Sequence, residues 1–84
     1  MAVRKRIEYG QYIVADPEIC HGKPTFKGTR IMVKSVLSMI AEGYDWHRIS
    51  GEYDGRISRE AIAEAVELAR EALIEKTERR PQAA

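Results

Sequence analysis

The stretch His21–Val33, which reads HGKPTFKGTRIMV, decides the fold of this chain because it sets a turn between two apolar segments. Thr25–Phe26 and Ile31–Val33 are rich in β-branched and aromatic residues, which favour strands. Lys27–Arg30 between them has the composition of a hairpin turn, and Gly28 within it adopts a positive φ without steric cost. The stretch therefore predicts a β-hairpin.

The two glycines of this stretch also raise the question of a phosphate-binding loop. Such a loop has the pattern Gly-x-x-x-x-Gly-Lys-Ser/Thr between a strand and a helix. Gly22 and Gly28 have a different spacing, and a strand rather than a helix is predicted after Arg30. The favoured interpretation is structural: Gly22 and Pro24 shape and stiffen the start of the hairpin, and Gly28 with Thr29 forms its turn.

The hairpin carries three cations, Lys23, Lys27 and Arg30, whose partners the sequence leaves open. They either face a polyanion or an acidic protein surface, or they bind within the fold. The planar guanidinium of Arg30 suits a carboxylate or a helix C-terminus of the same chain, and it equally suits a phosphate outside it.

Upstream of the hairpin, the segment Tyr12–Ile19 is apolar and is interrupted by Asp16–Pro17, which predicts a short strand followed by a turn. Downstream, from Lys34, apolar residues recur at helical spacing as far as Gly43. Gly43 is predicted to close this first helix as a C-terminal cap, with Tyr44 making the accompanying hydrophobic contact.

Two further helices are predicted. The side-chain oxygen of Asp45 caps a short second helix whose inward face is Trp46, Ile49 and Tyr53. Ser58 is expected to cap a long third helix. The apolar stripe expected along the third helix consists of Ile62, Val66, Ala69 and Leu73, flanked by Ala61, Ala65, Leu68 and Ala72.

The expected organisation is one mainly α domain over residues 1–78. It has a β-hairpin region over about 7–33, three helices over about 34–78, and a frayed tail at 79–84. A chain of 84 residues has room for one modest core, and a partner chain would help to cover it. A homodimer is therefore expected.

Charge is distributed unevenly along the chain. The net charge is only +1, so composition alone makes no case for nucleic acid. Residues 1–34 carry seven basic and three acidic side chains, residues 35–58 two and four, and residues 59–84 five and six. These blocks amount to +4, −2 and −1, so the basic surface is expected at the front of the chain. Its cations are Arg4, Lys5, Arg6, Lys23, Lys27, Arg30 and Lys34.

The single cysteine excludes an internal disulfide framework and fits a reducing cytoplasm, where the protein is expected. No long apolar segment follows the basic residues near the N-terminus, so neither a secretory signal nor a membrane span is predicted.

The pattern as a whole resembles a bacterial and archaeal family known as domain of unknown function 433. The resemblance runs from Asp16 to about Ala69 and includes Asp-Pro-Glu-Ile, then Gly22-Lys23-Pro24, then Gly28-Thr29-Arg30 before Ile-Met-Val. Two departures are visible: Phe26 stands where the family has a smaller aliphatic residue, and Asp54 replaces the usual proline after Tyr53.

This resemblance implies a homeodomain-like three-helix fold of the helix-turn-helix type, preceded by an N-terminal hairpin. It also implies an antitoxin of a type II toxin–antitoxin pair, encoded beside a PIN-type ribonuclease. In that interpretation Arg79 and Arg80 reach the acidic site of the ribonuclease.

Catalysis, metal binding and cofactor binding are not expected. Cys20 and His21 are neighbours, and in an extended chain neighbouring side chains point to opposite faces. A zinc site needs three or four ligands, and His47 is the only other histidine. The third helix carries carboxylates at intervals of three and four residues that are interpreted as a solvated face: Glu60, Glu64, Glu67 and Glu71.

These glutamates also bear on the DNA-binding alternative, an operator-binding regulator of its own operon. In homeodomain-like modules the third helix enters the major groove, and acidic side chains there are repelled by phosphates. If DNA is bound, Arg4, Lys5, Arg6 and the hairpin are the better candidates. A third alternative is a structural homo-oligomer that associates through the hairpin or the third helix.

Overall fold

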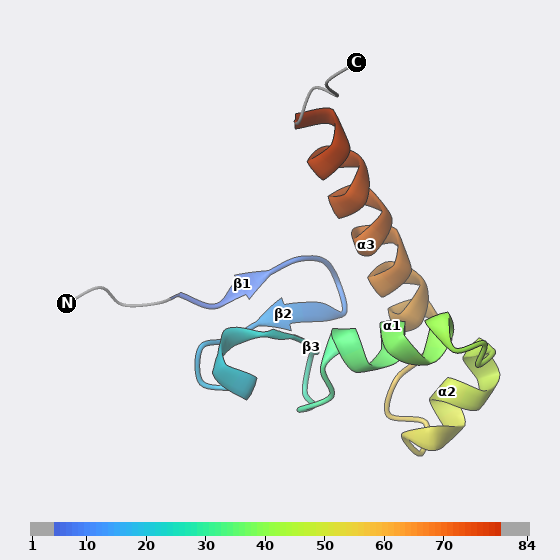
Figure 1. Ribbon diagram of the computed structural model, residues 1–84. Helices are drawn as coiled ribbons and strands as arrows, with labels where there is room; N and C mark the ends of the chain where they lie inside the picture. Colours follow the sequence, from blue (N-terminus) through green and yellow to red (C-terminus); the bar gives the residue numbers. More distant parts are fainter. Residues whose placement is uncertain (1–4, 80–84) are drawn as a thin grey trace.

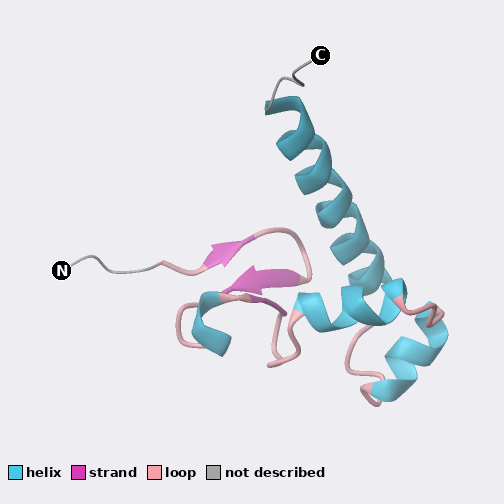
Figure 2. Cartoon of the chain, viewed as in Figure 1, coloured by secondary structure: helices cyan, strands magenta, loops and turns pink. Residues whose placement is uncertain are grey.

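The computed structural model describes the backbone of residues 5–79 and the side chains of residues 5–78. It consists of a small antiparallel sheet at the N-terminal end followed by three α-helices, so the mainly α architecture is confirmed (Figure 1). Figure 2 shows that the strands lie to one side of the helices and that the last helix runs away from both.

The sheet contains three short strands in the order β1-β2-β3. β1 (Ile7–Glu8) pairs with β2 (Ile13–Ala15), and β2 pairs with β3 (Pro24–Phe26). β2 is buried along its whole length, whereas β1 is exposed on both faces, which is why no apolar pattern marks β1 in the sequence. Between β2 and β3 lies the 3-10 turn η1 (Cys20–Gly22).

The strand predicted at Ile31–Val33 is wrong in extent. Thr25 and Met32 form only an isolated bridge, and α1 (Val33–Ala41) begins at the next residue. Val33 and Val36 are then buried on the inner face of α1. The β-propensity at the end of this apolar run is overridden because Val33 fills the core from the first turn of α1, and strand propensity depends on such context.

The helix ends follow local sequence signals. Gly43 has a φ of 98°, and the N–H of Tyr44 donates to the carbonyl of Met39, which closes α1 with a left-handed cap. Asp45 Oδ1 accepts from the backbone N–H of Arg48 at 2.8 Å and caps α2 (Trp46–Glu52), as predicted.

The third helix, α3 (Arg59–Arg79), has an equivalent cap at its start, because Ser58 Oγ accepts from the N–H of Ala61 at 3.1 Å. The core lies where this first part of α3 meets α1, α2 and the sheet. Its largest fully buried side chains include Ile13, Val36, Ile49, Ile57 and Ile62.

The apolar stripe predicted along α3 is buried only in its first half. Ile62 and Ala65 are buried, but every residue from Ala69 to Glu78 is exposed, and Leu73 is 62% exposed. With a rise of about 1.5 Å per residue, this part of the helix extends about 15 Å beyond the core. We call residues 69–78 the α3 arm; it projects from the rest of the molecule in Figure 1.

Candidate interaction site

The turn between β1 and β2 is held by a carboxylate from α3. Glu64 accepts the backbone N–H of Gln11 at 2.9 Å and that of Tyr12 at 2.8 Å. A Cβ atom at Gly10 would lie 2.6 Å from this carboxyl group, so a larger residue there would displace the end of the Glu64 side chain. Glu64 is therefore a structural anchor, and its assignment to a solvated acidic face is wrong. The sequence gives no sign of the contact, because its partners lie more than fifty residues away.

The Gly28-Thr29 turn is closed by the threonine side chain. Thr29 Oγ1 donates to the carbonyl of Phe26 at 2.8 Å and accepts from the N–H of Ile31 at 3.0 Å. Gly28 has a φ of 77°, as the turn prediction requires. These bonds fix the chain as it passes from β3 into α1.

Two of the predicted binding cations lie beside the same carboxylate. The ammonium of Lys27 is 3.3 Å from Glu8 Oε1, and the guanidinium of Arg6 is 3.6 Å from Glu8 Oε2. All three side chains are partly or largely exposed, so each pair stabilises the fold by no more than about 1 kcal/mol. Glu8 thereby offsets part of the basic charge of the sheet.

The other predicted cations are not brought together with these. Lys23 and Arg30 are exposed, and neither side chain makes an ion pair or hydrogen bond with another residue of the described chain. Lys5 is exposed beside a surface hollow of about 400 Å³ under β1. Predictions for Arg4 and Arg80 lie outside the described residues, as does the side chain of Arg79, whose backbone ends α3.

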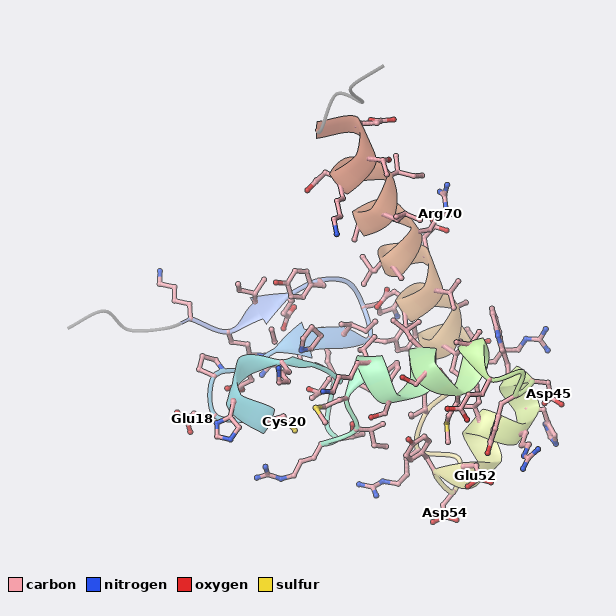
Figure 3. All side chains as sticks on the ribbon, in the orientation of Figure 1. Glu18, Cys20, Asp45, Glu52, Asp54 and Arg70 are labelled. Carbon is pink, nitrogen blue, oxygen red and sulfur yellow. The ribbon has the colours of Figure 1, made fainter. Side chains whose placement is uncertain are left out.

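The turn η1 differs from the extended chain assumed for Cys20 and His21. Cys20, His21 and Gly22 all have positive φ, at 51°, 58° and 83°. Cys20 Sγ donates to the carbonyl of Arg30 at 3.5 Å and so connects η1 to the turn before α1 (Figure 3). Within the described residues, no group of three or more His, Cys, Asp or Glu side chains is arranged to hold a metal ion.

The aromatic residues of the helical corner pack on the core and carry arginines on their outer faces. Tyr44, Trp46 and Tyr53 are half-buried against the core, in agreement with their predicted packing role. The guanidinium of Arg48 lies 4.2 Å from the ring centre of Tyr44. That of Arg59 lies 5.8 Å from the ring centre of Trp46, and both distances suit cation–π contacts.

Halfway along α3, Arg70 and Glu67 form a close ion pair, with Nη2 of Arg70 2.6 Å from Oε2 of Glu67. The hydrogen bond from Arg70 lowers the pKa of the Glu67 carboxyl, and the same pairing raises the pKa of Arg70. Figure 3 shows Arg70 on the flank of the projecting helix. Of the four glutamates predicted to be solvated, one is thus an anchor and a second is paired.

An apolar groove, which the sequence did not predict, runs between β3, α1 and α3. It consists of two adjoining hollows of about 340 Å³ and 240 Å³ that share Pro24, Val33 and Leu37. Its α3 wall is formed by Ala65, Leu68, Ala69 and Ala72, and Lys23 and Lys34 lie at its other end. The alanine-rich spacing on α3 is the only sequence signal for it.

Comparisons with known proteins agree with the motifs of the hairpin. No helix of residues 5–79 combines the length and the apolar character that a membrane span needs. No curated protein and no solved structure matches the chain. The family described as "Protein of unknown function (DUF433)" matches residues 13–69, which is more than half of the chain. This segment runs from β2 through the first half of α3, and the chain belongs to that family.

Proposed function

We propose that this chain is a non-enzymatic interaction domain, the antitoxin-like member of a type II toxin–antitoxin pair that binds and masks a PIN-type ribonuclease. The observation that carries the proposal is the shape of α3, whose last ten described side chains, residues 69–78, are all exposed over a length of about 15 Å. A helix that extends from a compact domain is well suited to lie in the groove of another protein.

The resemblance of the hairpin motif to an antitoxin-like family supports the choice of partner. The end of α3 leads into Arg79 and Arg80, and guanidinium groups form bidentate hydrogen bonds with carboxylates. In a ribonuclease that holds its metal with acidic side chains, such a guanidinium competes for those carboxylates and lowers activity.

The test is co-expression with a PIN-type ribonuclease encoded beside the gene, followed by affinity capture and a ribonuclease assay. We expect capture and loss of ribonuclease activity with the unaltered chain. The double variant Arg79→Glu/Arg80→Glu is expected to lose protection, whereas Arg4→Glu/Lys5→Glu, with the same change in charge at the other end, retains it. Absence of capture, or equal loss of protection in both variants, sinks the proposal.

A second candidate function is a DNA-binding autoregulator with a homeodomain-like helix-turn-helix. It is favoured by the exposure of Lys23 and Arg30, which have no carboxylate partner among the described residues and are available to phosphates. On α3 the exposed Glu60 and Glu71 oppose entry of this helix into the major groove, so the contact is assigned to the hairpin.

This alternative is tested by fluorescence anisotropy with the promoter DNA of the same operon over a range of salt concentrations. Each phosphate contact contributes about 0.9 to the slope of log K against log salt. Lys23→Glu/Arg30→Glu is expected to remove about two phosphate contacts and to make the slope shallower by the corresponding amount. An unchanged slope rejects the hairpin mode, and binding that is absent at low salt rejects DNA recognition altogether.

A further inference from the structure

We propose that two copies of this chain associate by an antiparallel crossing of their α3 helices, so that the α3 arm of each copy lies in the apolar groove of the other. A second copy and the proposed ribonuclease compete for the same α3 arm, and the experiments below use the chain alone, so that their results do not depend on a ribonuclease. It assigns one occupant, a second copy, to two surfaces that a single copy leaves uncovered: the groove and the α3 arm.

The groove and the α3 arm are continuous with each other, because both are formed by α3. Leu68, Ala69 and Ala72 form a wall of the groove, and the same helix continues directly into the α3 arm. A twofold axis near Ala69 and Ala72 therefore places the arm of each copy over the groove of the other copy. Self-complementary contacts of this kind are the rule in closed dimers.

The side chains at the crossing of the two helices are small. Ala65, Ala69 and Ala72 follow one face of α3 at helical spacing, and small residues allow two helix axes to approach to about 8 Å. Leu73, which is 62% exposed, and Leu37, which is half-buried in the groove, supply apolar side chains for the contact. Burial of Leu73 against a partner removes exposed apolar surface from water and so favours association.

The groove and the α3 arm carry charges of opposite sign. Lys23 and Lys34 stand at the end of the groove away from α3, and no acidic residue lines either hollow. The α3 arm, residues 69–78, carries three acidic and two basic side chains, a net charge of −1, and Arg70 within it pairs with Glu67. The acidic arm of one copy thus meets the basic end of the other groove, and such complementarity selects a register and disfavours a basic partner helix.

The first experiment measures the mass of the full chain by analytical ultracentrifugation over a range of concentrations. We expect a monomer–dimer equilibrium that Ala72→Glu shifts toward monomer by more than tenfold. Ala63→Glu is the matched control, because Ala63 is an exposed alanine of α3 that does not line the groove. Both sites are exposed, and circular dichroism verifies that both variants remain folded.

The second experiment exchanges the charges. One variant, Lys23→Glu/Lys34→Glu, has an acidic arm and an acidic groove, and the other, Glu71→Lys/Glu78→Lys, has a basic arm and a basic groove. Each is expected to be monomeric alone, and an equimolar mixture is expected to form a heterodimer. The control mixture is Lys5→Glu/Arg56→Glu with Glu42→Lys/Glu52→Lys, which has the same net charges on exposed residues outside the groove and the arm.

The outcomes separate the proposal from its alternatives. The proposal is supported if heterodimers form in the mixture of the groove variant with the arm variant and not in the control mixture. A chain that stays monomeric up to about 1 mM, near the weak limit of specific association, overturns it and leaves the groove to a different protein. A dimer that is unaffected by Ala72→Glu, or equal association in the control mixture, also overturns it. None of these results depends on whether a ribonuclease is bound.

Discussion

Glu64 on α3 accepts the backbone N–H of Tyr12 at 2.8 Å, and this bond joins the β1–β2 turn to a helix 52 residues further along the chain. The same carboxylate also bonds Gln11, so the sheet and α3 are held together at one point. Hydrogen bonds to a charged acceptor are stronger than neutral ones. Glu64 therefore adds a polar anchor to the apolar packing of Ile13 and Phe26 against the start of α3.

We expect Glu64→Ala to lower the free energy of unfolding by about 1–3 kcal/mol, because two backbone N–H groups lose a charged acceptor. Gly10→Ala should cost nearly as much, since its Cβ would lie 2.6 Å from the carboxyl group and would displace it. In the double variant Gly10→Ala/Glu64→Ala, the second substitution should then lower the free energy of unfolding only slightly further. Urea denaturation of the four proteins in this cycle measures the coupling.

The control for this cycle is Glu52→Ala, an exposed glutamate at the end of α2, which should change stability by less than about 0.5 kcal/mol. If the effects of Gly10→Ala and Glu64→Ala simply add, Gly10 is not required by the carboxylate.

Thr29 supplies a second prediction. Thr29→Val keeps the shape of the side chain but removes the donor to Phe26 and the acceptor for Ile31. We expect a loss of about 1–2 kcal/mol in the free energy of unfolding. Thr29→Ser retains the hydroxyl and should recover most of this loss. Equal unfolding midpoints for the valine and serine variants would contradict the assigned role of the hydroxyl.

Two glycines of the helical region should respond in opposite directions to the same substitution. Gly43→Ala places a Cβ at a φ of 98° and should destabilise the chain by about 1 kcal/mol or more. Gly51 lies inside α2, and a Cβ there meets no atom within 4 Å. Gly51→Ala should stabilise by up to about 1 kcal/mol because alanine favours helix. Thermal unfolding of both variants verifies the sign, and a shift in the same direction refutes this assignment.

The ion pair between Glu67 and Arg70 predicts a weak dependence on pH. Because Arg70 lowers the pKa of Glu67 in the folded chain, the pair contributes above the ordinary glutamate pKa, 4.5. Its contribution is lost as the pH falls through the lowered value. Carboxyl titration by NMR should give Glu67 a midpoint below the ordinary glutamate value, 4.5, and Arg70→Ala should return it to the ordinary range. A midpoint for Glu67 at or above 4.5 is the contrary result.

The turns and the helix ends could be predicted from local sequence alone. The left-handed glycines at positions 28 and 43 and the caps Asp45 and Ser58 each act on backbone groups within a few residues. Such interactions depend on local spacing, which can be predicted without knowing the rest of the fold. The hairpin motif that marks the family has the same local character.

Which apolar and charged residues are covered could not be predicted, because it depends on contacts between distant segments. Val33 lies in α1 because its side chain packs into the core from that helix. Glu64 anchors the β1–β2 turn because this turn, far away in sequence, presents two N–H groups to its carboxylate. The apolar pattern of α3 continues in the sequence as far as Leu73, yet only the part that packs against other elements is buried. Burial depends on contacts between distant segments, and periodicity describes only the face that is available for them.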